Sequence, residues 1–234
     1  MFRKFPRELL IAIRLTLVLA VVTGIVYPLV MTGVAQGLFH DKANGSLVTD
    51  RNGTVIGSAL IGQCFYRTEK DKSGNLVYST TKDDQGNVVF VADTRYFQSR
   101  PSFTVDAATG LPLPCNAANS VGSNLGPGNA ALISRVKGYT DYLYSLGIAV
   151  NPDGSRQPMP VDLVTGDFTG FDPDITEAGA LAQVDMVARA RKIAPSRLRD
   201  LVAMHVDGRS AGVFGEPHVN VLSLNKAIDD GAAG

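Results

Sequence analysis

"LTLVLAVVTGIVYPLVMTGV", Leu15 to Val34, is a run of 20 residues without a charged side chain. At a rise of about 1.5 Å per residue, a helix of this length covers the roughly 30 Å hydrocarbon core of a bilayer. The run therefore predicts a transmembrane helix, and this helix determines on which side of the membrane the rest of the chain lies.

The charges on either side of this run predict its orientation. Arg3, Lys4, Arg7 and Arg14 precede it against the single acid Glu8, and no basic residue follows it before Lys42. The positive-inside rule then places residues 1–14 in the cytoplasm and residues 35–234 outside it, as a single-pass membrane protein. A signal peptide cleaved after Ala35 is the alternative, but the apolar run is longer than the 7 to 15 residues of a typical signal core.

Proline interrupts the predicted helix. Pro28 leaves the carbonyl of Gly24 without its helical donor, which predicts a kink. A neighbouring helix or the Thr23 hydroxyl could help to satisfy that carbonyl. This favours a helix packed among others over a lone anchor.

Composition and cysteine count exclude several protein classes. The 234 residues include 22 basic and 22 acidic ones, so the formal net charge of zero gives no indication of a nucleic-acid partner. Cys64 and Cys115 fit neither a disulfide scaffold nor a zinc site. Free thiols are the expectation, and a disulfide in an oxidising compartment is the alternative.

The chain beyond the membrane has the element order of one mixed α+β domain. Gly-Asn turns before β-branched and aromatic residues predict a three-stranded meander within residues 67–93. Helical spacing predicts one helix between Pro127 and Gly147, one that begins near Asp174 or Thr176, and one after Pro195. The second of these is expected to bury Leu181, Val184, Val187 and Ala188. Alternation from Val219 to Leu224 predicts a strand, followed by a short helix to Asp230.

The tetrapeptide that begins at Asp71 resembles a phosphorylation motif and lies within a short repeat. Asp71-Lys-Ser-Gly differs by one residue from Asp-Lys-Thr-Gly, whose aspartate is phosphorylated in P-type ATPases. However, Lys-Asp-x-x-Gly-Asn-x-Val occurs at both Lys70–Val77 and Lys82–Val89, and each copy leads into a turn. The chain also has no Gly-x-x-x-x-Gly-Lys-Ser/Thr loop to cradle a nucleotide. We therefore interpret Asp71 as a turn residue and not as a phosphorylated nucleophile.

Eight segments, taken together and in order, resemble the KdpC family, the C subunits of the bacterial potassium-transporting ATPase complex KdpFABC. They are NGSL (44–47), GSALIGQ (57–63), YFQSRPS (96–102), GSNLGPGN (122–129), PVDLVTG (160–166), FDPDIT (171–176), QVDMVARAR (183–191) and GEPHVNVLSLNKAID (215–229). Two features depart from the family pattern: Gly166–Thr169 replaces a run of small residues, and Arg67 to Asp93 resembles an insertion.

This resemblance implies a non-catalytic accessory subunit in the inner membrane. In the family, the channel-like A subunit selects potassium, the B subunit hydrolyses ATP with magnesium, and the F subunit is a small helix. The C subunit is needed for assembly and activity and is described as a catalytic chaperone that raises the ATP affinity of the B subunit. No cofactor is expected to bind this chain directly, and any effect on ATP affinity would be coupled between distant sites.

The resemblance and the membrane helix together supply candidate partner-contact residues. These are Gly24, Pro28, Asn44, Gly45, Ser46, Arg100, Pro101, Ser102, Gly122, Ser123, Asn124, Asp162, Asp172, Asp174, Gln183 and Arg189. No catalytic or metal-ligating residue is expected among them.

Each candidate has a structural alternative. The shared glycines are expected at turns of positive φ rather than at phosphates; they are Gly45, Gly57, Gly62, Gly122, Gly126 and Gly128. Arg100 fits either a contact with the A subunit or an ion pair within the domain. Asp162, Asp167, Asp172 and Asp174 match no calcium loop, and helix capping explains Asp172 and Asp174. Gln183, Arg189 and Arg191 are expected on a solvated or subunit-facing side of their helix.

Two other functions compete with the accessory subunit. An independent enzyme would need a nucleophile with a placed base, and no motif supports one. A secreted or membrane-anchored binding domain without pump partners is the second alternative, and the sequence of the mature N-terminus would test the secreted form.

Overall fold

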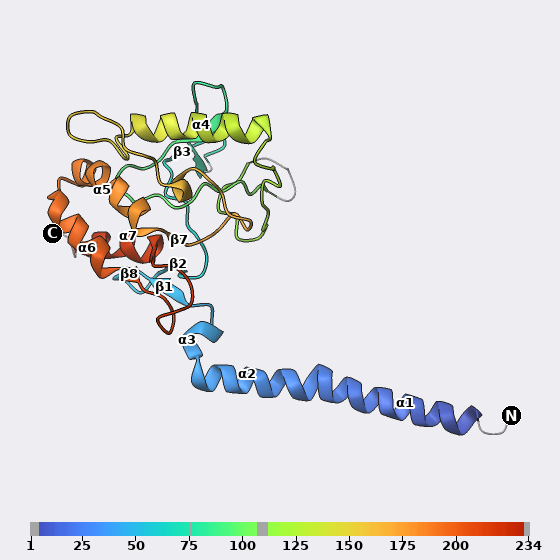
Figure 1. The fold of residues 1–234 in the computed structure, drawn as a ribbon. Coiled ribbons are helices and arrows are strands. Elements are labelled where there is room, and N and C mark those ends of the chain that lie inside the picture. Colours follow the sequence, from blue (N-terminus) through green and yellow to red (C-terminus); the bar gives the residue numbers. More distant parts are fainter. Residues whose placement is uncertain (1–4, 75, 107–111, 232–234) are drawn as a thin grey trace. The chain divides into compact units, whose positions relative to one another are not determined.

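The structure is a computed structural model that describes residues 5–74, 76–106 and 112–231. The chain divides into two compact units, Met1–Leu47 and Val48–Gly234. The first unit is helical, and the second combines helices with small sheets, as the α+β prediction requires (Figure 1).

The first unit contains one long apolar helix. It consists of α1 (Phe5–Val21), a π-helical turn (Val22–Val26) and α2 (Tyr27–Leu38), and the short α3 (His40–Ala43) follows. Its stretch Pro6–Leu38 is 33 residues long, unburied, and the one helix in the described chain that is long and apolar enough to cross a membrane. The helix extends beyond the predicted Leu15–Val34 at both ends. Arg7 and Arg14 lie on α1, whereas Arg3 and Lys4 lie outside the described residues.

The irregularity predicted at Pro28 is a π-helical turn just before it. The backbone N–H of Tyr27 donates to the carbonyl of Val22, five residues back. Such turns are a known way for a helix to accommodate an interruption of its regular hydrogen bonding. The Thr23 hydroxyl donates to the carbonyl of Leu19 at 2.7 Å, so its predicted role at Gly24 is wrong.

The second unit has its core where three helices meet a small antiparallel sheet. The helices are α5 (Glu177–Arg191), α6 (Pro195–Met204) and α7 (Val221–Asp229), and the sheet has the order β7 (Asp174–Ile175), β9 (His218–Asn220), β8 (Val206–Asp207). Fully buried aliphatic side chains from these elements include Val184, Val187, Leu198, Leu201, Val202, Val219 and Leu224. Each contributes about 1.5–3 kcal/mol relative to an exposed position.

All three predicted helices are confirmed, and each has a local start signal. Asn129 accepts a hydrogen bond from Ala131 N–H at the start of α4 (Ala130–Ser145), and Thr176 accepts one from Gly179 N–H at the start of α5. Pro195 is the first residue of α6. The predicted burial of Leu181 is wrong, because this side chain is 40% exposed.

The predicted strand Val219–Leu224 is wrong beyond Asn220. The Asn220 side chain accepts a hydrogen bond from Ser223 N–H and caps α7. Val221, Leu222, Leu224 and Ile228 are buried at helical spacing. The apolar alternation was therefore the start of a helix whose cap stops the strand.

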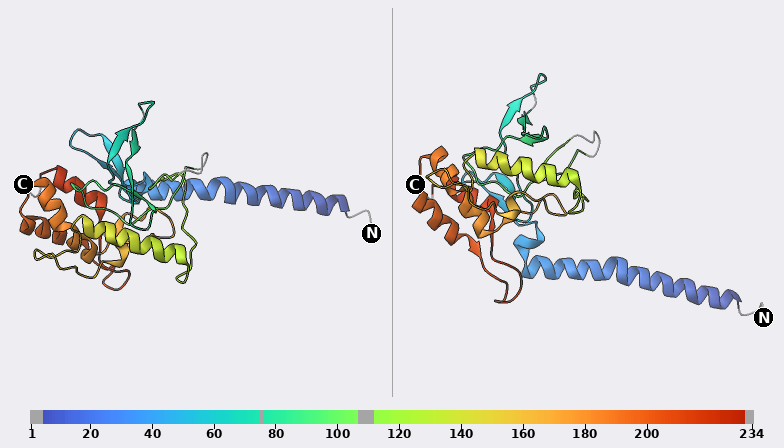
Figure 2. Two further views of the ribbon diagram at one scale, coloured as in Figure 1. Left: turned by 90° about the horizontal axis from the view of Figure 1, so that it is seen from above. Right: turned by 45° about the horizontal axis from the view of Figure 1, so that its top comes forward.

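The predicted three-stranded meander is also wrong, because the repeat forms two separate hairpins. Strands β3 (Thr68–Lys70) and β4 (Leu76–Tyr78) make one antiparallel pair, and β5 (Thr80–Lys82) and β6 (Val88–Phe90) make the other. The hairpins project from the rest of the α+β unit in both views of Figure 2. A further pair, β1 (Leu47–Thr49) and β2 (Val55–Ser58), precedes them.

The two hairpins join through a closed ring of backbone hydrogen bonds. Arg67 N–H donates to Val91 O, Val91 N–H to Ser79 O, and Ser79 N–H to Arg67 O, at 2.8, 2.9 and 2.9 Å. The preceding residues Tyr66, Tyr78 and Phe90 form an aromatic cluster with ring centroids 5.4–6.1 Å apart. Arg67, Ser79 and Val91 are 12 residues apart, so the ring has an approximate threefold arrangement. At each of these residues the chain stops pairing with one neighbouring segment and begins to pair with another.

Candidate functional site

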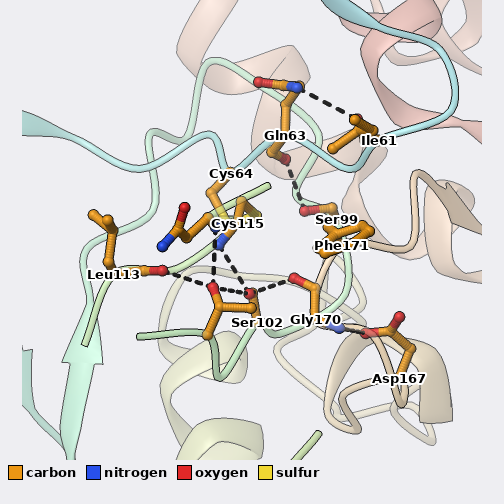
Figure 3. Close-up of a disulfide and its surroundings, with 12 residues drawn as sticks. Ile61, Gln63, Cys64, Ser99, Ser102, Leu113, Cys115, Asp167, Gly170 and Phe171 are labelled. Carbon is orange, nitrogen blue, oxygen red and sulfur yellow. Dashed lines mark hydrogen bonds between the residues drawn. A yellow bond between two sulfur atoms is a disulfide. The ribbon is translucent and has the colours of Figure 1, made fainter. Parts of the chain in front are cut away.

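Loops that carry five of the candidate residues come together around one disulfide, which Figure 3 shows with its neighbours. These candidates are Arg100, Pro101, Ser102, Asp172 and Asp174. Gly62 N–H donates to Phe171 O at 2.7 Å, and the Ser99 hydroxyl donates to Gln63 O at 2.9 Å. We call this set of loops, residues 62–64, 99–104, 113–116 and 167–174, the loop cluster.

Cys64 and Cys115 form the disulfide of the loop cluster, with their Cα atoms 5.7 Å apart. The expectation of free thiols is wrong. The two residues are 51 positions apart in sequence, and only the folding of the intervening hairpins brings them together. Nothing local in the sequence indicates this pairing.

Two buried hydroxyls connect the disulfide to the rest of the loop cluster. Ser102 donates to the carbonyl of Gly170 and accepts a hydrogen bond from Cys115 N–H at 2.8 Å (Figure 3). Thr104 donates to Leu113 O at 2.6 Å and accepts one from Asn116 N–H at 3.0 Å. Both hydroxyls are thus engaged with backbone groups and hold three loops in register.

Arg100 forms an ion pair inside the domain. Its Nη1 lies 3.3 Å from Oδ2 of Asp172, and both side chains are a little more than one quarter exposed. The pair links the loop after Phe97 to the loop before β7. The structural alternative for Arg100 is therefore realised, and its contact with another subunit stays a prediction.

The four carboxylates proposed from the sequence have separate structural roles. Asp162 is buried and accepts a hydrogen bond from Thr176 N–H at 2.6 Å, whereas Asp172 accepts one from Asp174 N–H at 3.0 Å. Asp167 accepts one from Gly170 N–H at 2.8 Å. Thr176 caps α5, so the predicted capping by Asp172 and Asp174 is wrong. Within the described ranges, no group of three His, Cys, Asp or Glu side chains is arranged for a metal ion.

Asp174 is the carboxylate nearest to a histidine. Its Oδ2 lies 3.7 Å from His218 Nε2, and its Oδ1 accepts a hydrogen bond from the side chain of Asn220 at 3.0 Å. Burial raises the pKa of Asp174, and both neighbours partly oppose this shift. The other ring nitrogen of His218 lies 3.0 Å from the carbonyl of Glu216. The histidine is thus placed beside a carboxylate and a carbonyl, and neither is a nucleophile that it could activate.

Gln183 is fully buried, so its predicted position on a solvated or subunit-facing side is wrong. Its amide accepts a hydrogen bond from Gln98 N–H at 2.7 Å and donates to Gln98 O at 3.1 Å. Asn225 does the same for Phe97, accepting from its N–H and donating to its carbonyl, both at 2.9 Å. The segment that leads into the loop cluster is therefore fixed by two side-chain amides. Asn225 was not among the predicted residues, although an amide within the apolar face of α7 is a usable signal.

Arg189, the other candidate on α5, is exposed. It donates to Leu146 O at 3.3 Å, at the end of α4, and to Asp185 O at 3.0 Å. The Leu146 contact places a positive charge at the carbonyl end of α4, and the side chain of Arg189 stays at the surface.

The shared glycines fall into different classes. Gly45 has φ of 89°, as predicted, and the neighbouring Ser46 also has positive φ. The prediction is wrong for Gly57, Gly62, Gly122, Gly126 and Gly128, whose φ is not positive. A Cβ at Gly62 would lie 2.5 Å from Asp172 O, so that residue is needed for close backbone approach. Gly122 likewise lies against the backbone of Phe168.

The remaining candidates lie at different depths. Pro101 is buried, and Ser123 is partly buried. Asn124 is exposed and has φ of 53°. Gly24 and Pro28 lie on the exposed apolar helix, and Asn44 donates to the carbonyl of His40 at the end of α3.

Comparisons with known proteins agree on one family. A family model described as KdpC, the c chain of K+-transporting ATPase, matches residues 9–230. The potassium-transporting ATPase KdpC subunit of Methylobacterium nodulans is 46% identical over 227 residues, which are 93% of this chain and 96% of the relative. The KdpC subunits of Rhodopseudomonas palustris and Bradyrhizobium diazoefficiens are 45% and 44% identical, over 95% and 97% of this chain and 98% of each relative.

Proposed function

The chain belongs to the KdpC family of potassium-transporting ATPase subunits, and from this we propose that it is a non-catalytic accessory subunit of an ATP-driven potassium import complex. The observation that carries the proposal is the family match over residues 9–230, which spans both the apolar helix and the α+β unit. Its partners are then a channel-like A subunit, an ATP-hydrolysing B subunit and a small F subunit.

The α+β unit is proposed to lie outside the cytoplasm, held at the inner membrane by the helix Pro6–Leu38. Two independent features support this orientation. The basic residues Arg7 and Arg14 precede the apolar run, as the positive-inside rule requires of a cytoplasmic N-terminus. The Cys64–Cys115 disulfide is of the kind that persists in oxidising compartments such as the bacterial periplasm.

The subunit acts without chemistry of its own in this proposal. Most polar groups of the loop cluster are committed to backbone partners or ion pairs, which suits a rigid docking surface more than a reaction centre. ATP and magnesium bind the B subunit and potassium binds the A subunit. Any effect of this chain on ATP affinity is therefore transmitted through the membrane-embedded parts of the complex.

The contact surface is proposed to consist of the candidate residues that are not buried. The exposed ones are Gly24, Pro28, Asn44, Asn124 and Arg189, and the partly buried ones are Gly45, Ser46, Arg100, Gly122, Ser123, Asp172 and Asp174. Ser102, Asp162 and Gln183 contribute indirectly, because their buried side chains hold the loops in place.

Co-purification tests this function. The affinity-tagged full chain, expressed with its neighbours and extracted in mild detergent, should retain a channel-like protein and a P-type ATPase that potassium stimulates. As a control, the chain with an unrelated apolar helix in place of residues 15–34 should lose most of this retention. Isolation of the native chain alone from membranes that contain both partners would contradict the proposal and favour an independent binding domain.

A further inference from the structure

A cavity of about 210 Å³ lies between the second hairpin, the loop after Arg100 and helix α4. Its walls are mostly apolar and are formed chiefly by Tyr66, Phe90, Phe103, Val105, Pro112 and Tyr139. The aromatic cluster of the hairpins thus forms one side, and α4 forms the other. Engineered apolar cavities of about 150 Å³ bind benzene, so the space is sufficient for a small ring or a short alkyl chain.

The polar groups around the cavity form hydrogen bonds with other groups of the protein, with one exception among the described residues. The carboxylate of Asp83 accepts hydrogen bonds from Gln85 N–H and Asn87 N–H at 3.0 and 2.8 Å. The hydroxyls of Ser102 and Thr104 are bound within the loop cluster. The exception is Arg135 of α4, which forms no hydrogen bond or ion pair with any residue in the described part of the chain.

Arg135 lies over an aromatic ring of the cavity wall. Its Cζ is 3.7 Å from the centre of the Phe103 ring, a cation–π contact. The side chain of Arg135 is partly buried, and this burial lowers the pKa of its guanidinium. Arg135 is thus a partly buried cation with no counter-ion among the described residues, and an anion that reached it would be stabilised. A guanidinium binds a carboxylate through two parallel hydrogen bonds.

We propose that this cavity is a binding site for a small organic monocarboxylate, with an aromatic or short alkyl body among Tyr66, Phe90 and Val105 and its carboxylate on Arg135. The size and the apolar walls exclude a nucleotide, whose phosphates would need several cationic or backbone donors. The same chemistry is offered by an aromatic acid from solution and by a free fatty acid from the membrane.

Ligand-observed ¹⁹F NMR with 4-fluorobenzoate tests the site on the full chain, held in nanodiscs of neutral phosphatidylcholine. We expect saturable binding that Arg135→Gln weakens at least about tenfold, as for loss of a charged hydrogen-bond partner. The matched control is Lys137→Gln, on the same helix, because Lys137 pairs with Asp141 and does not line the cavity. This control should bind like the native chain, and Arg135→Lys should retain part of the affinity.

The source of the ligand is distinguished by competition. Displacement of 4-fluorobenzoate by millimolar benzoate but not by octanoate assigns the site to aromatic acids, and the reverse preference assigns it to fatty acids. Absence of saturable binding would overturn the proposal. So would equal affinity in the native chain and a folded Arg135→Gln variant, or equal affinity for the neutral 4-fluorobenzamide. The measurement needs no partner subunit, so its outcome is independent of the proposed function.

Discussion

At the scale of single residues, two buried side-chain amides fix the backbone that leads into the loop cluster. Gln183 of α5 and Asn225 of α7 bind the backbone of Gln98 and Phe97 as a neighbouring strand would. Because these backbone groups are buried, each would cost about 1–3 kcal/mol if left unpaired. The backbone conformation of this segment therefore depends on side chains that are distant in sequence.

Replacement of Gln183 tests this role. Gln183→Met keeps the volume of the side chain but leaves Gln98 N–H and C=O without partners, so we expect the free energy of unfolding to fall by about 2–4 kcal/mol. Urea unfolding followed by circular dichroism measures the change. The exposed Gln157→Met is the control and should shift the value by less than about 0.5 kcal/mol. An equal fall in the free energy of unfolding for both variants would show that Gln183 has no special role.

Asp93 gives the α+β unit a defined pH dependence. Hydrogen bonds from the Arg95 side chain are the main cause that lowers the pKa of Asp93. The folded-state pKa is thus below the unfolded value of about 3.9, so the pair stabilises the fold above that pH and the contribution is lost as pH falls through the folded pKa. Asp93→Asn should lower the free energy of unfolding by about 1 kcal/mol at pH 7.

The difference between the native chain and Asp93→Asn should vanish as the pH falls well below about 4. Unfolding curves at a series of pH values check this convergence. A difference that stayed constant with pH would mean that packing, and not the charge of Asp93, is responsible.

Asp71 is a turn residue in the structure. Its carboxylate accepts a hydrogen bond from Ser73 N–H at 2.8 Å, and Asp83 makes the equivalent bond to Gln85 in the second copy of the repeat. Asparagine keeps this acceptor. Asp71→Asn should therefore leave the potassium-stimulated ATPase activity of the assembled complex unchanged. Loss of that activity with normal assembly would show that Asp71 has a chemical role.

At the scale of elements, the disulfide acts on the pair of hairpins that it encloses. Cys64 and Cys115 close a loop with a sequence separation of 51 residues, and the aromatic cluster of Tyr66, Tyr78 and Phe90 lies within it. Closing such a loop restricts the unfolded chain, which stabilises the fold by about 3–4 kcal/mol in the chain-entropy description.

The double variant Cys64→Ser, Cys115→Ser should lose about this amount of stability while keeping the helical core of α5, α6 and α7. Thermal unfolding with and without a reducing agent measures it. The reductant should destabilise the native chain and leave the double variant unchanged. Equal sensitivity of both proteins to the reductant would contradict the assignment.

The elements also show what the sequence could predict. Helices α4, α5 and α6 were predictable because Asn129, Thr176 and Pro195 mark their starts locally. The hairpins and the end of β9 were not, because strand partners there depend on a ring of long-range hydrogen bonds and on the cap at Asn220. The resemblance covers parts of three of the four loops in the loop cluster and none of residues 113–116. The disulfide and the buried amides depend on tertiary contacts, which no local pattern indicates.

At the scale of the whole molecule, the chain combines one apolar helix with an α+β unit. The helix Pro6–Leu38 is long and apolar enough to cross a membrane, and lipid or neighbouring membrane helices would then cover its apolar surface. Membership of the KdpC family is consistent with both lipid and other subunits of a potassium-transporting ATPase complex around the helix. The side of the membrane on which the α+β unit lies decides whether it can meet ATP.

The most direct measurement is labelling by a membrane-impermeant maleimide in cells with an opened outer membrane. Phe168 is 94% exposed on the α+β unit, and both native cysteines are held in the disulfide, so Phe168→Cys supplies the one reactive thiol. Glu8→Cys, near the N-terminal end of the apolar helix, is the control. We predict that Phe168→Cys is labelled while the inner membrane is intact and Glu8→Cys only after that membrane is lysed. Labelling of Glu8→Cys before this lysis, with Phe168→Cys protected until then, would contradict the account.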